Sequence, residues 1–208
     1  MTGVRWVRDI LRTGWLHYRL AKVSSPGWLC GHTDMRKKVT IHSDGGCHGN
    51  PGPGGWAAVL AYDKHRKEIS GGSPATTNNR MELQAAVEAL NALKESCEVQ
   101  FFTDSQYVRQ GITSWLASWK ANDWRTKSRQ PVMNEDLWRA LEQAASRHQV
   151  NWIWLKGHAG HAGNERCDEL AAAQIARIKQ SHTHDQLKVE LAHFKRRQRT
   201  AQPVSELF

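Results

Sequence analysis

Four carboxylates stand at positions where a folded chain does not usually keep charge. Asp44 and Asp104 each end a stretch, "VTIHSD" and "VQFFTD", whose alternating or apolar pattern predicts a β-strand. Glu82 falls within the apolar stripe of a helix predicted over about 77–95, if each residue advances by about 100°. Asp168 shares a helical side with small apolar residues in "CDELAAA". A carboxylate on a buried face is unfavourable unless a partner satisfies it, so a shared partner has to be considered.

Each position also has a local explanation. Asp44 and Asp104 could cap turns or helices, and Glu82 could interact with the dipole at a helix N-terminus. In open α/β sheets, however, ligands bind at the ends of the strands. Carboxylates that converge there would repel one another, and hard cations such as Mg²⁺ relieve that repulsion. Two such ions about 3.5–4 Å apart can hold the attacking and leaving oxygens of a phosphoryl displacement.

A glycine-rich loop, "SDGGCHGNPGPGGW", follows the first predicted strand directly after Asp44. It lacks the Lys-Ser/Thr end of a nucleotide P-loop, and no G-x-G-x-x-G opens a helix. We interpret its glycines as room for a sugar-phosphate backbone to approach Asp44.

The pattern of elements predicts an α/β fold. Three strands come first, the second and third forming a hairpin, and helices then alternate with two further strands. Such an order predicts a mixed sheet with helices on both faces. The strands are "KVTIHSD", "GGWAAVLAYD", "HRKEISGG", "VQFFTD" and "VNWIWLK", and the helices lie near 77–95, 105–121, 134–148 and 164–180.

The 208 residues carry a formal charge of +9, of which residues 36–176 hold only +2. Basicity therefore belongs mostly to the two ends and is weak evidence for nucleic-acid binding. No apolar run approaches membrane-spanning length, so we expect no membrane partner. The four cysteines are widely spaced and form no C-x-x-C pair, which predicts reduced thiols and a cytoplasmic location.

The chain divides into three regions. Residues 1–35 form a basic extension that has the arginine-rich, acid-poor character of an organelle presequence. We favour a second interpretation, in which the start is mis-assigned and translation begins at Met35. The reason is that Gly14, Pro26 and Gly27 break the segment. Residues 36–180 form the folded domain. Residues 181–208 form a basic tail that we expect to be flexible.

Four ordered blocks resemble type 1 ribonuclease H of the bacterial kind over about residues 36–176. They are "SDGGCHGNPGPGGW", "TTNNRMELQAAVEAL", "TDSQYVRQGI" and "KGHAGHAGNERCDELA". The resemblance implies a five-stranded mixed sheet with helices on both faces. It makes residues 36–180 a catalytic domain, expected to act as a monomer. The implied reaction is endonucleolytic hydrolysis of the RNA strand of an RNA–DNA hybrid, giving 5′-phosphate and 3′-hydroxyl ends.

The resemblance also implies roles for individual residues. Asp44 would bridge two Mg²⁺ ions, with Mn²⁺ as an alternative metal. Asp168 would complete the site of the ion that activates water, while Glu82 and Asp104 would hold the ion at the leaving oxygen. His158, flanked by glycine, would assist proton transfer or product departure.

The resemblance also implies that two groups of residues bind the substrate. The first would contact the 2′-hydroxyl that distinguishes RNA, and consists of Cys47, Asn50, Asn78, Asn79 and Gln106. The second resembles a protruding basic handle that grips phosphates of the DNA strand, with no acidic partners expected at hand. It consists of Trp115, Trp119, Lys120, Trp124, Arg125, Lys127 and Arg129. Ala75 stands where many relatives carry a basic residue.

Two other functions fit parts of the pattern. A retroviral-type ribonuclease H or integrase-like nuclease would share the fold, but the block around His158 and the basic handle argue against an integrase. A hybrid-binding module without catalysis would need no carboxylate cluster, because amides in those places would not repel one another.

Overall fold

The computed structural model describes residues 36–157 and 159–201. Everything described belongs to one unit of the chain, Met35–Phe208. The predictions made for residues 1–35 and for His158 lie outside the described residues.

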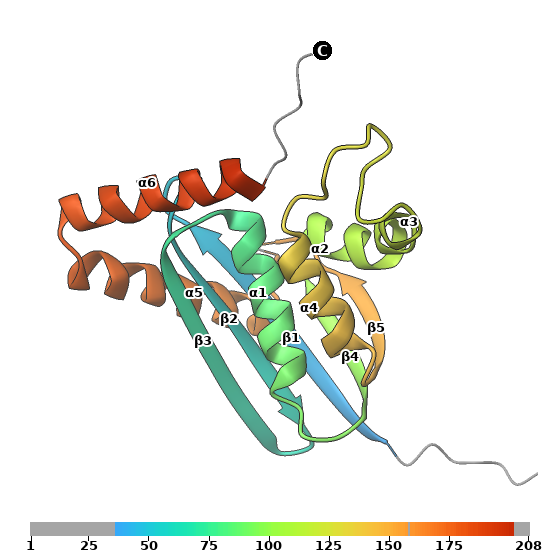
Figure 1. The fold of residues 1–208 in the computed structure, drawn as a ribbon. Coiled ribbons are helices and arrows are strands. Elements are labelled where there is room, and N and C mark those ends of the chain that lie inside the picture. The colour runs from blue at the N-terminus through green and yellow to red at the C-terminus, as the bar shows by residue number, and fades with distance from the viewer. Residues whose placement is uncertain (1–35, 158, 202–208) are drawn as a thin grey trace, which may run out of the picture. The chain divides into compact units, whose positions relative to one another are not determined.

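A five-stranded mixed sheet forms the centre of the fold, as predicted, in the order β3-β2-β1-β4-β5 (Figure 1). β1, β2 and β3 are antiparallel, and β4 and β5 run parallel to β1. Ser43 of β1 pairs with Thr103 of β4, so both strands direct their next residues to the same edge of the sheet. The strands are β1 (Lys37–Cys47), β2 (Gly52–Tyr62), β3 (His65–Thr76), β4 (Cys97–Thr103) and β5 (Gln149–Trp154).

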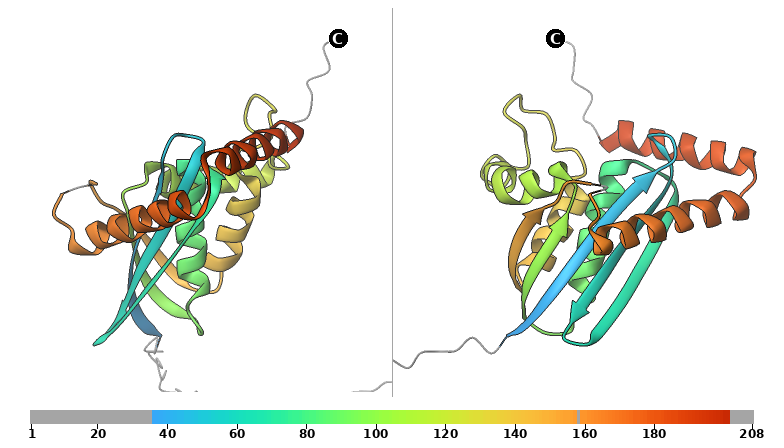
Figure 2. Two further views of the ribbon diagram at one scale, coloured as in Figure 1. Left: turned by 90° about the vertical axis from the view of Figure 1, so that its left-hand side faces the viewer. Right: turned by 180° about the vertical axis from the view of Figure 1, so that it is seen from behind.

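Helices cover both faces of the sheet. On one face α1 (Asn78–Asn91) packs on β1 and β2, and α4 (Glu135–Ala145) packs on α1. On the other face α5 (Ala162–Ser181) lies across β1, β2 and β3, as the view from behind shows (Figure 2). The segment between β4 and α4 is helical as α2 (Gln106–Gln110), a π-turn η1 (Gly111–Trp115) and α3 (Leu116–Ala121).

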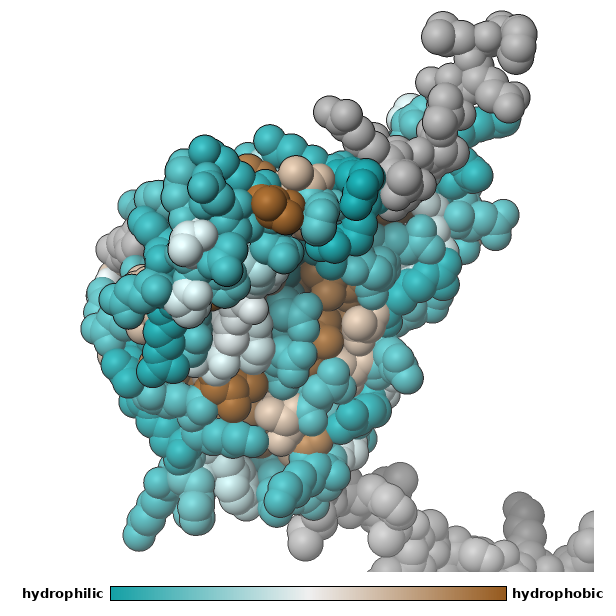
Figure 3. All heavy atoms as spheres, turned by 60° about the vertical axis from the view of Figure 1, so that its left-hand side comes forward, coloured by the Kyte–Doolittle hydropathy of each residue, from teal (hydrophilic) through white to brown (hydrophobic). Residues whose placement is uncertain are grey.

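The alternation of β2 explains why there are two cores. Ala58 and Leu60 join the larger core under α1 and α4, whereas Ala57 and Val59 join a small core under α5. The surface seen in Figure 3 is mostly hydrophilic, with apolar atoms exposed only in small areas. Within residues 36–157 and 159–201, no helix has both the length and the apolar character needed to cross a bilayer.

The prediction of a flexible tail is wrong for residues 184–201, which form helix α6 (His184–Ala201). Leu187, Leu191 and Phe194 follow the spacing i, i+4, i+7 of a helical stripe, which the basic composition of the segment obscures. Phe194 is 6% exposed, and α6 packs against β3. The helix lies at the end of the sheet where β1 finishes (Figure 1).

Candidate active site

Asp44 and Asp104 lie at the shared edge of the sheet. Asp44 follows Ser43 in β1, and Asp104 follows Thr103 at the end of the neighbouring parallel strand β4. Both residues are partly buried. The Asp44 Oδ1 accepts a 2.7 Å hydrogen bond from the main-chain N–H of Gly45. The alternation that predicted two strand-end carboxylates therefore places both at one edge.

Glu82 is placed beside them by a close contact between α1 and β1. A Cβ on Gly45 would lie 2.3 Å from the main-chain nitrogen of Glu82 and 2.3 Å from the carbonyl carbon of Met81. Glycine is therefore required here so that the start of α1 can rest on the strand next to Asp44. Our interpretation of this glycine as room for substrate needs correction, because the space is filled by the helix.

The Glu82 carboxyl group is perturbed by this position. Burial, followed by the neighbouring charges of Asp44 and Asp104, raises its pKa to about 8. The side-chain amide of Asn78 donates a 2.8 Å hydrogen bond to Oε1 and partly opposes the rise. Oε2 is buried and has no hydrogen-bond partner within the described part of the chain. Glu82 is thus a carboxyl group without enough positive charge around it.

Of the residues expected to contact a 2′-hydroxyl, Asn50, Asn78 and Asn79 lie at the start of α1, whereas Gln106 begins α2. Asn50 Oδ1 accepts a 3.3 Å hydrogen bond from the main-chain N–H of Asn78, so the side chain of the glycine-rich loop caps the helix. Thr77, the residue preceding α1, makes no side-chain cap hydrogen bond. Asn79 and Gln106 are exposed. The Cys47 thiol instead bonds to main-chain carbonyl oxygens, those of Gly49 at 2.7 Å and Gly52 at 3.3 Å nearby and that of Thr76 at the end of β3 at 3.3 Å.

Asp168 lies on α5 and is exposed. α5 is seated by Gly55, where a Cβ would lie 2.2 Å from the Ala171 carbonyl oxygen. The preceding residue, Cys167, donates a 3.3 Å hydrogen bond to the His42 carbonyl of β1. Burial, followed by the charge of Asp44, raises the pKa of this thiol to about 12. This link brings the main chain at Asp168 to the Asp44 region.

A divalent cation fits this donor set. Within residues 36–157 and 159–201, no three His, Cys, Asp or Glu side chains are grouped closely enough to hold an ion by themselves. Mg²⁺ commonly takes one or two protein carboxylates and completes its shell with water and phosphate oxygens. Such an ion would relieve both the orphaned Oε2 and the raised pKa of Glu82.

Asn164 is a site residue that sequence reasoning missed. It is 4% exposed on α5, and its amide donates a 3.1 Å hydrogen bond to Asp104 Oδ2. Trp154 Nε1 donates to the main-chain carbonyl of Asp104 at 2.9 Å. A Cβ on Gly157 would lie 2.8 Å from the same Oδ2, so the chain passes Asp104 just before His158. The only sequence signal for Asn164 was its place within the "KGHAGHAGNERCDELA" block.

The basic handle differs from expectation at two residues. Lys120 pairs with Glu142 of α4, so the expectation that its charge has no acidic partner is wrong. Trp124, expected to contact substrate, is 6% exposed in the main core with the Arg139 guanidinium 4.3 Å from its ring centre. Both partners are distant in sequence, which hides the contacts. Trp115 and Trp119 are partly buried, and Arg125, Lys127 and Arg129 are exposed.

Fold and site together define an α/β protein with an acidic site at its parallel strand ends. A sequence model of RNase H matches residues 36–176. A ribonuclease H of Aeromonas hydrophila subsp. hydrophila is 61% identical over 137 residues, covering 66% of this chain and 89% of the relative. One of Chelativorans sp. strain BNC1 is 53% identical over 161 residues, covering 77% and 99%. The solved structure of LC9-RNase H1, a type 1 RNase H with the type 2 active-site motif, has a TM-score of 0.64 at 35% identity, covering 69% of this chain and 74% of that one. The chain belongs to the ribonuclease H family.

Proposed function

We propose that this protein is an endonuclease that hydrolyses the RNA strand of RNA–DNA hybrids with the help of Mg²⁺. One observation carries the proposal. In a chain of the ribonuclease H family, burial and the charges of Asp44 and Asp104 raise the pKa of Glu82 to about 8. A buried carboxyl group whose charge is opposed by two neighbouring carboxylates is suited to a divalent cation and a phosphodiester substrate.

Four carboxylates would hold two Mg²⁺ ions, with Mn²⁺ as an alternative: Asp44, Glu82, Asp104 and Asp168. When bound, such ions make a nucleophile from water near neutral pH and stabilise the charge on the leaving oxygen. The products would carry 5′-phosphate and 3′-hydroxyl ends.

The protein's own side chains fix the orientation of these carboxylates. Asn164 donates to Asp104 Oδ2, which holds the plane of that carboxylate and leaves Oδ1 available. Asn78 does the same for Glu82 through Oε1 and leaves Oε2 available. Asn50 in turn holds the main chain of Asn78. Removal of an orienting amide should therefore weaken catalysis without unfolding the site.

Selection of RNA would come from amide and main-chain groups near the starts of α1 and α2. Asn50, Asn79 and Gln106 carry side chains that both donate and accept, as contact with a 2′-hydroxyl requires. His158 would move the proton of the leaving or attacking group.

We also propose that the protein works as a monomer in the cytoplasm. The monomer is implied by the family resemblance. The location rests on the cysteines, since the three described ones, Cys47, Cys97 and Cys167, are all free thiols.

A cleavage assay on three matched substrates tests the proposed function. The full chain should cut the RNA of a hybrid in Mg²⁺, be inert in EDTA, and leave duplex DNA and duplex RNA of the same sequence intact. Asp104→Asn should abolish cleavage while hybrid binding is largely retained. Cleavage of the DNA duplex would indicate an integrase-like nuclease, and binding without cleavage would indicate a binding module. Either result would refute the proposal.

A further inference from the structure

Helix α6 forms one wall of a pocket at the edge of the proposed substrate site. The pocket has a volume of about 530 Å³, and α6 contributes Phe194, Lys195 and Gln198 to its lining. The helix lies beyond residues 36–176, the part of the chain that matches the family's sequence model. Its contribution is therefore an addition to the machinery that the resemblance implies.

The lining of this pocket suits an anion. Apart from α6, the lining includes five side chains with amide or hydroxyl groups, Asn50, Thr77, Asn79, Tyr107 and Asn134. Lys195 is the only charged residue among the described residues that line the pocket, and no carboxylate is among them. Neutral donors around one ammonium group are the chemistry that binds a phosphate.

The ammonium group of Lys195 is available for a ligand. Lys195 is exposed, and within residues 36–157 and 159–201 no carboxylate forms an ion pair with it. Its neighbour Phe194 is 6% exposed and packs α6 onto the body. A buried anchor next to an exposed cation fixes the lysine stem at the rim of the pocket.

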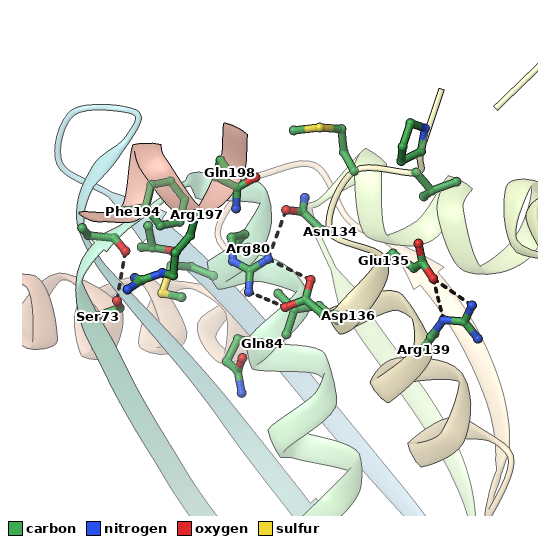
Figure 4. A pocket seen from close by; sticks show the side chains of 17 residues that line it. Ser73, Arg80, Gln84, Asn134, Glu135, Asp136, Arg139, Phe194, Arg197 and Gln198 are labelled. Carbon is green, nitrogen blue, oxygen red and sulfur yellow. Dashed lines mark hydrogen bonds and ion pairs between the residues drawn. The ribbon is translucent and has the colours of Figure 1, made fainter. Parts of the chain in front are cut away.

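A second pocket, of about 640 Å³, shares Met133, Asn134, Phe194 and Gln198 with the first but has a different set of charged residues. Figure 4 shows Phe194, Arg197 and Gln198 of α6 facing Arg80 and Asn134. Arg80 is already bound to Asp136 through two hydrogen bonds of 2.6 and 2.9 Å. Because this lining mixes both signs of charge, it serves to seat α6 rather than to bind an anion.

The pocket of about 530 Å³ that Lys195 lines is linked to the carboxylate site by hydrogen bonds. Asn50 in its lining bonds the main chain of Asn78, and the Asn78 side chain bonds Glu82. Thr77 and Asn79 of the lining flank Asn78 in sequence. A nucleic-acid strand that lies over the start of α1 would therefore pass both the carboxylates and Lys195.

We propose that α6 is an additional nucleic-acid-binding element, in which Lys195 and Gln198 bind a backbone phosphate of the hybrid. The inference rests on the proposed function for the identity of the ligand. Lys195 and Gln198 are substrate-positioning residues and take no part in the chemical step. The opposite role, α6 as a cover that hinders substrate, uses the same contacts and predicts the opposite effect of mutation.

Charge-neutral variants of the full chain test this proposal against a matched control. Lys195→Gln and Lys195→Gln/Gln198→Ala remove the pocket contacts, whereas Lys195→Arg keeps the charge. Lys188→Gln removes the same charge from the same helix outside both pockets, where Lys188 Nζ lies 3.5 Å from Asp185 Oδ1. Thermal melts of all variants establish that they fold alike. The readouts are kcat and KM for hybrid cleavage in Mg²⁺, and Kd for hybrid in EDTA.

We expect Lys195→Gln to raise KM and Kd about three- to tenfold with kcat unchanged, since one charged hydrogen bond is lost. The slope of log Kd against log salt should fall by about one, as for one lost phosphate contact. Lys195→Arg and Lys188→Gln should match the parent.

Three outcomes would overturn the proposal: equal Kd for Lys195→Gln and Lys188→Gln, tighter binding by Lys195→Gln, or faster cleavage by it. The last two would show that α6 hinders substrate. If the parent binds hybrid but does not cut it, the proposed function fails while the Kd comparison still decides the role of α6. If the parent neither binds nor cuts hybrid, both the proposed function and the proposed role of α6 are refuted.

Discussion

The amide of Asn164 donates a 3.1 Å hydrogen bond to Oδ2 of Asp104, joining the helix on one face of the sheet to a carboxylate at the strand ends. Asn164 is 4% exposed, so its amide has few alternative partners. Its Oδ1 is buried and has no hydrogen-bond partner within the described part of the chain. The side chain is therefore held in place chiefly by what it does for Asp104.

Asn164→Ala should lower kcat by about ten- to a hundredfold, because groups that orient metal-binding carboxylates typically have effects of this size. The Mg²⁺ concentration needed for half-maximal activity should rise, and Kd for hybrid in EDTA should stay unchanged. Cleavage assays across a Mg²⁺ titration measure both effects. Asn151→Ala, at an exposed asparagine of β5, is the control and should behave like the parent. An unchanged Mg²⁺ requirement in Asn164→Ala would remove Asn164 from the site.

The raised pKa of Glu82 predicts a pH-dependent loss of stability in the metal-free protein. Its pKa is about 8 in the folded chain against 4.5 ordinarily, so between these values the folded state binds one more proton than the unfolded state. Stability from this group is therefore lost as pH rises from about 4.5 to about 8. Glu82→Gln should remove this dependence, a difference on the order of 4 kcal/mol between the two ends of the range.

Urea unfolding in EDTA at several pH values measures that difference between parent and Glu82→Gln. Mg²⁺ should stabilise the parent more than the variant at pH 8, because the ion replaces the proton that Glu82 would otherwise hold. Parallel stability curves for the two proteins in EDTA would contradict the assigned environment of Glu82.

The parts of this site that sequence could predict are those that depend on local periodicity. The period of two predicts β1 and β4, although β1 continues past Asp44 to Cys47, so Asp44 lies within a strand and only Asp104 follows a strand end. The 3.6-residue period of α1 places Glu82 on its inner face. These periods also predict the strands and most helices, although α1 ends at Asn91 rather than near residue 95.

The parts that sequence could not predict depend on contacts between distant segments. Lys120 and Glu142 are 22 residues apart, and Asn164 and Asp104 are 60 apart, so no local pattern links them. Gly45 was assigned to a glycine-rich loop with room for substrate, but it lies in β1 and makes room for α1. α6 was overlooked because its charged residues outnumber the apolar ones that seat it.

Gly45→Ala should separate α1 from β1 and disturb the site from within. The added Cβ would meet main-chain atoms of Met81 and Glu82 at 2.3 Å, and backbone cannot move aside as a flexible side chain can. Overpacking of this kind costs about 1–3 kcal/mol, and kcat should fall as well because Glu82 shifts relative to Asp44. Urea unfolding and the cleavage assay measure the two effects.

Gly46→Ala is the matched control for this substitution. Its Cβ would meet only the Ile175 side chain, at an ordinary 3.7 Å, so stability and activity should stay near those of the parent. If both alanine variants behave alike, the contact between Gly45 and α1 does not position Glu82.

The handle should bind phosphate through its unpaired cations and not through Lys120. Lys120 already pairs with Glu142, whereas Lys127 and Arg129 are exposed and, within residues 36–157 and 159–201, form no ion pair with a carboxylate. Arg125 is left unchanged because its guanidinium donates a 3.0 Å hydrogen bond to the Arg129 carbonyl and supports the loop. The informative comparison is therefore Lys127→Gln/Arg129→Gln against Lys120→Gln.

The double variant should raise KM for hybrid severalfold at low salt and flatten the slope of log KM against log salt by about two, one for each lost phosphate contact. Lys120→Gln should change the slope by much less, because the charge it removes is largely neutralised by Glu142. The control is Lys64→Gln/Lys67→Gln, which also removes two charges. Both lysines lie at the hairpin where Tyr62 pairs with His65, at the opposite end of the strands from Asp44, so KM should stay unchanged. If the slope of log KM against log salt changed equally in all three variants, the handle would act only through the overall charge of the protein. Local binding of phosphates by the handle requires that the change depend on the position of the lost charge.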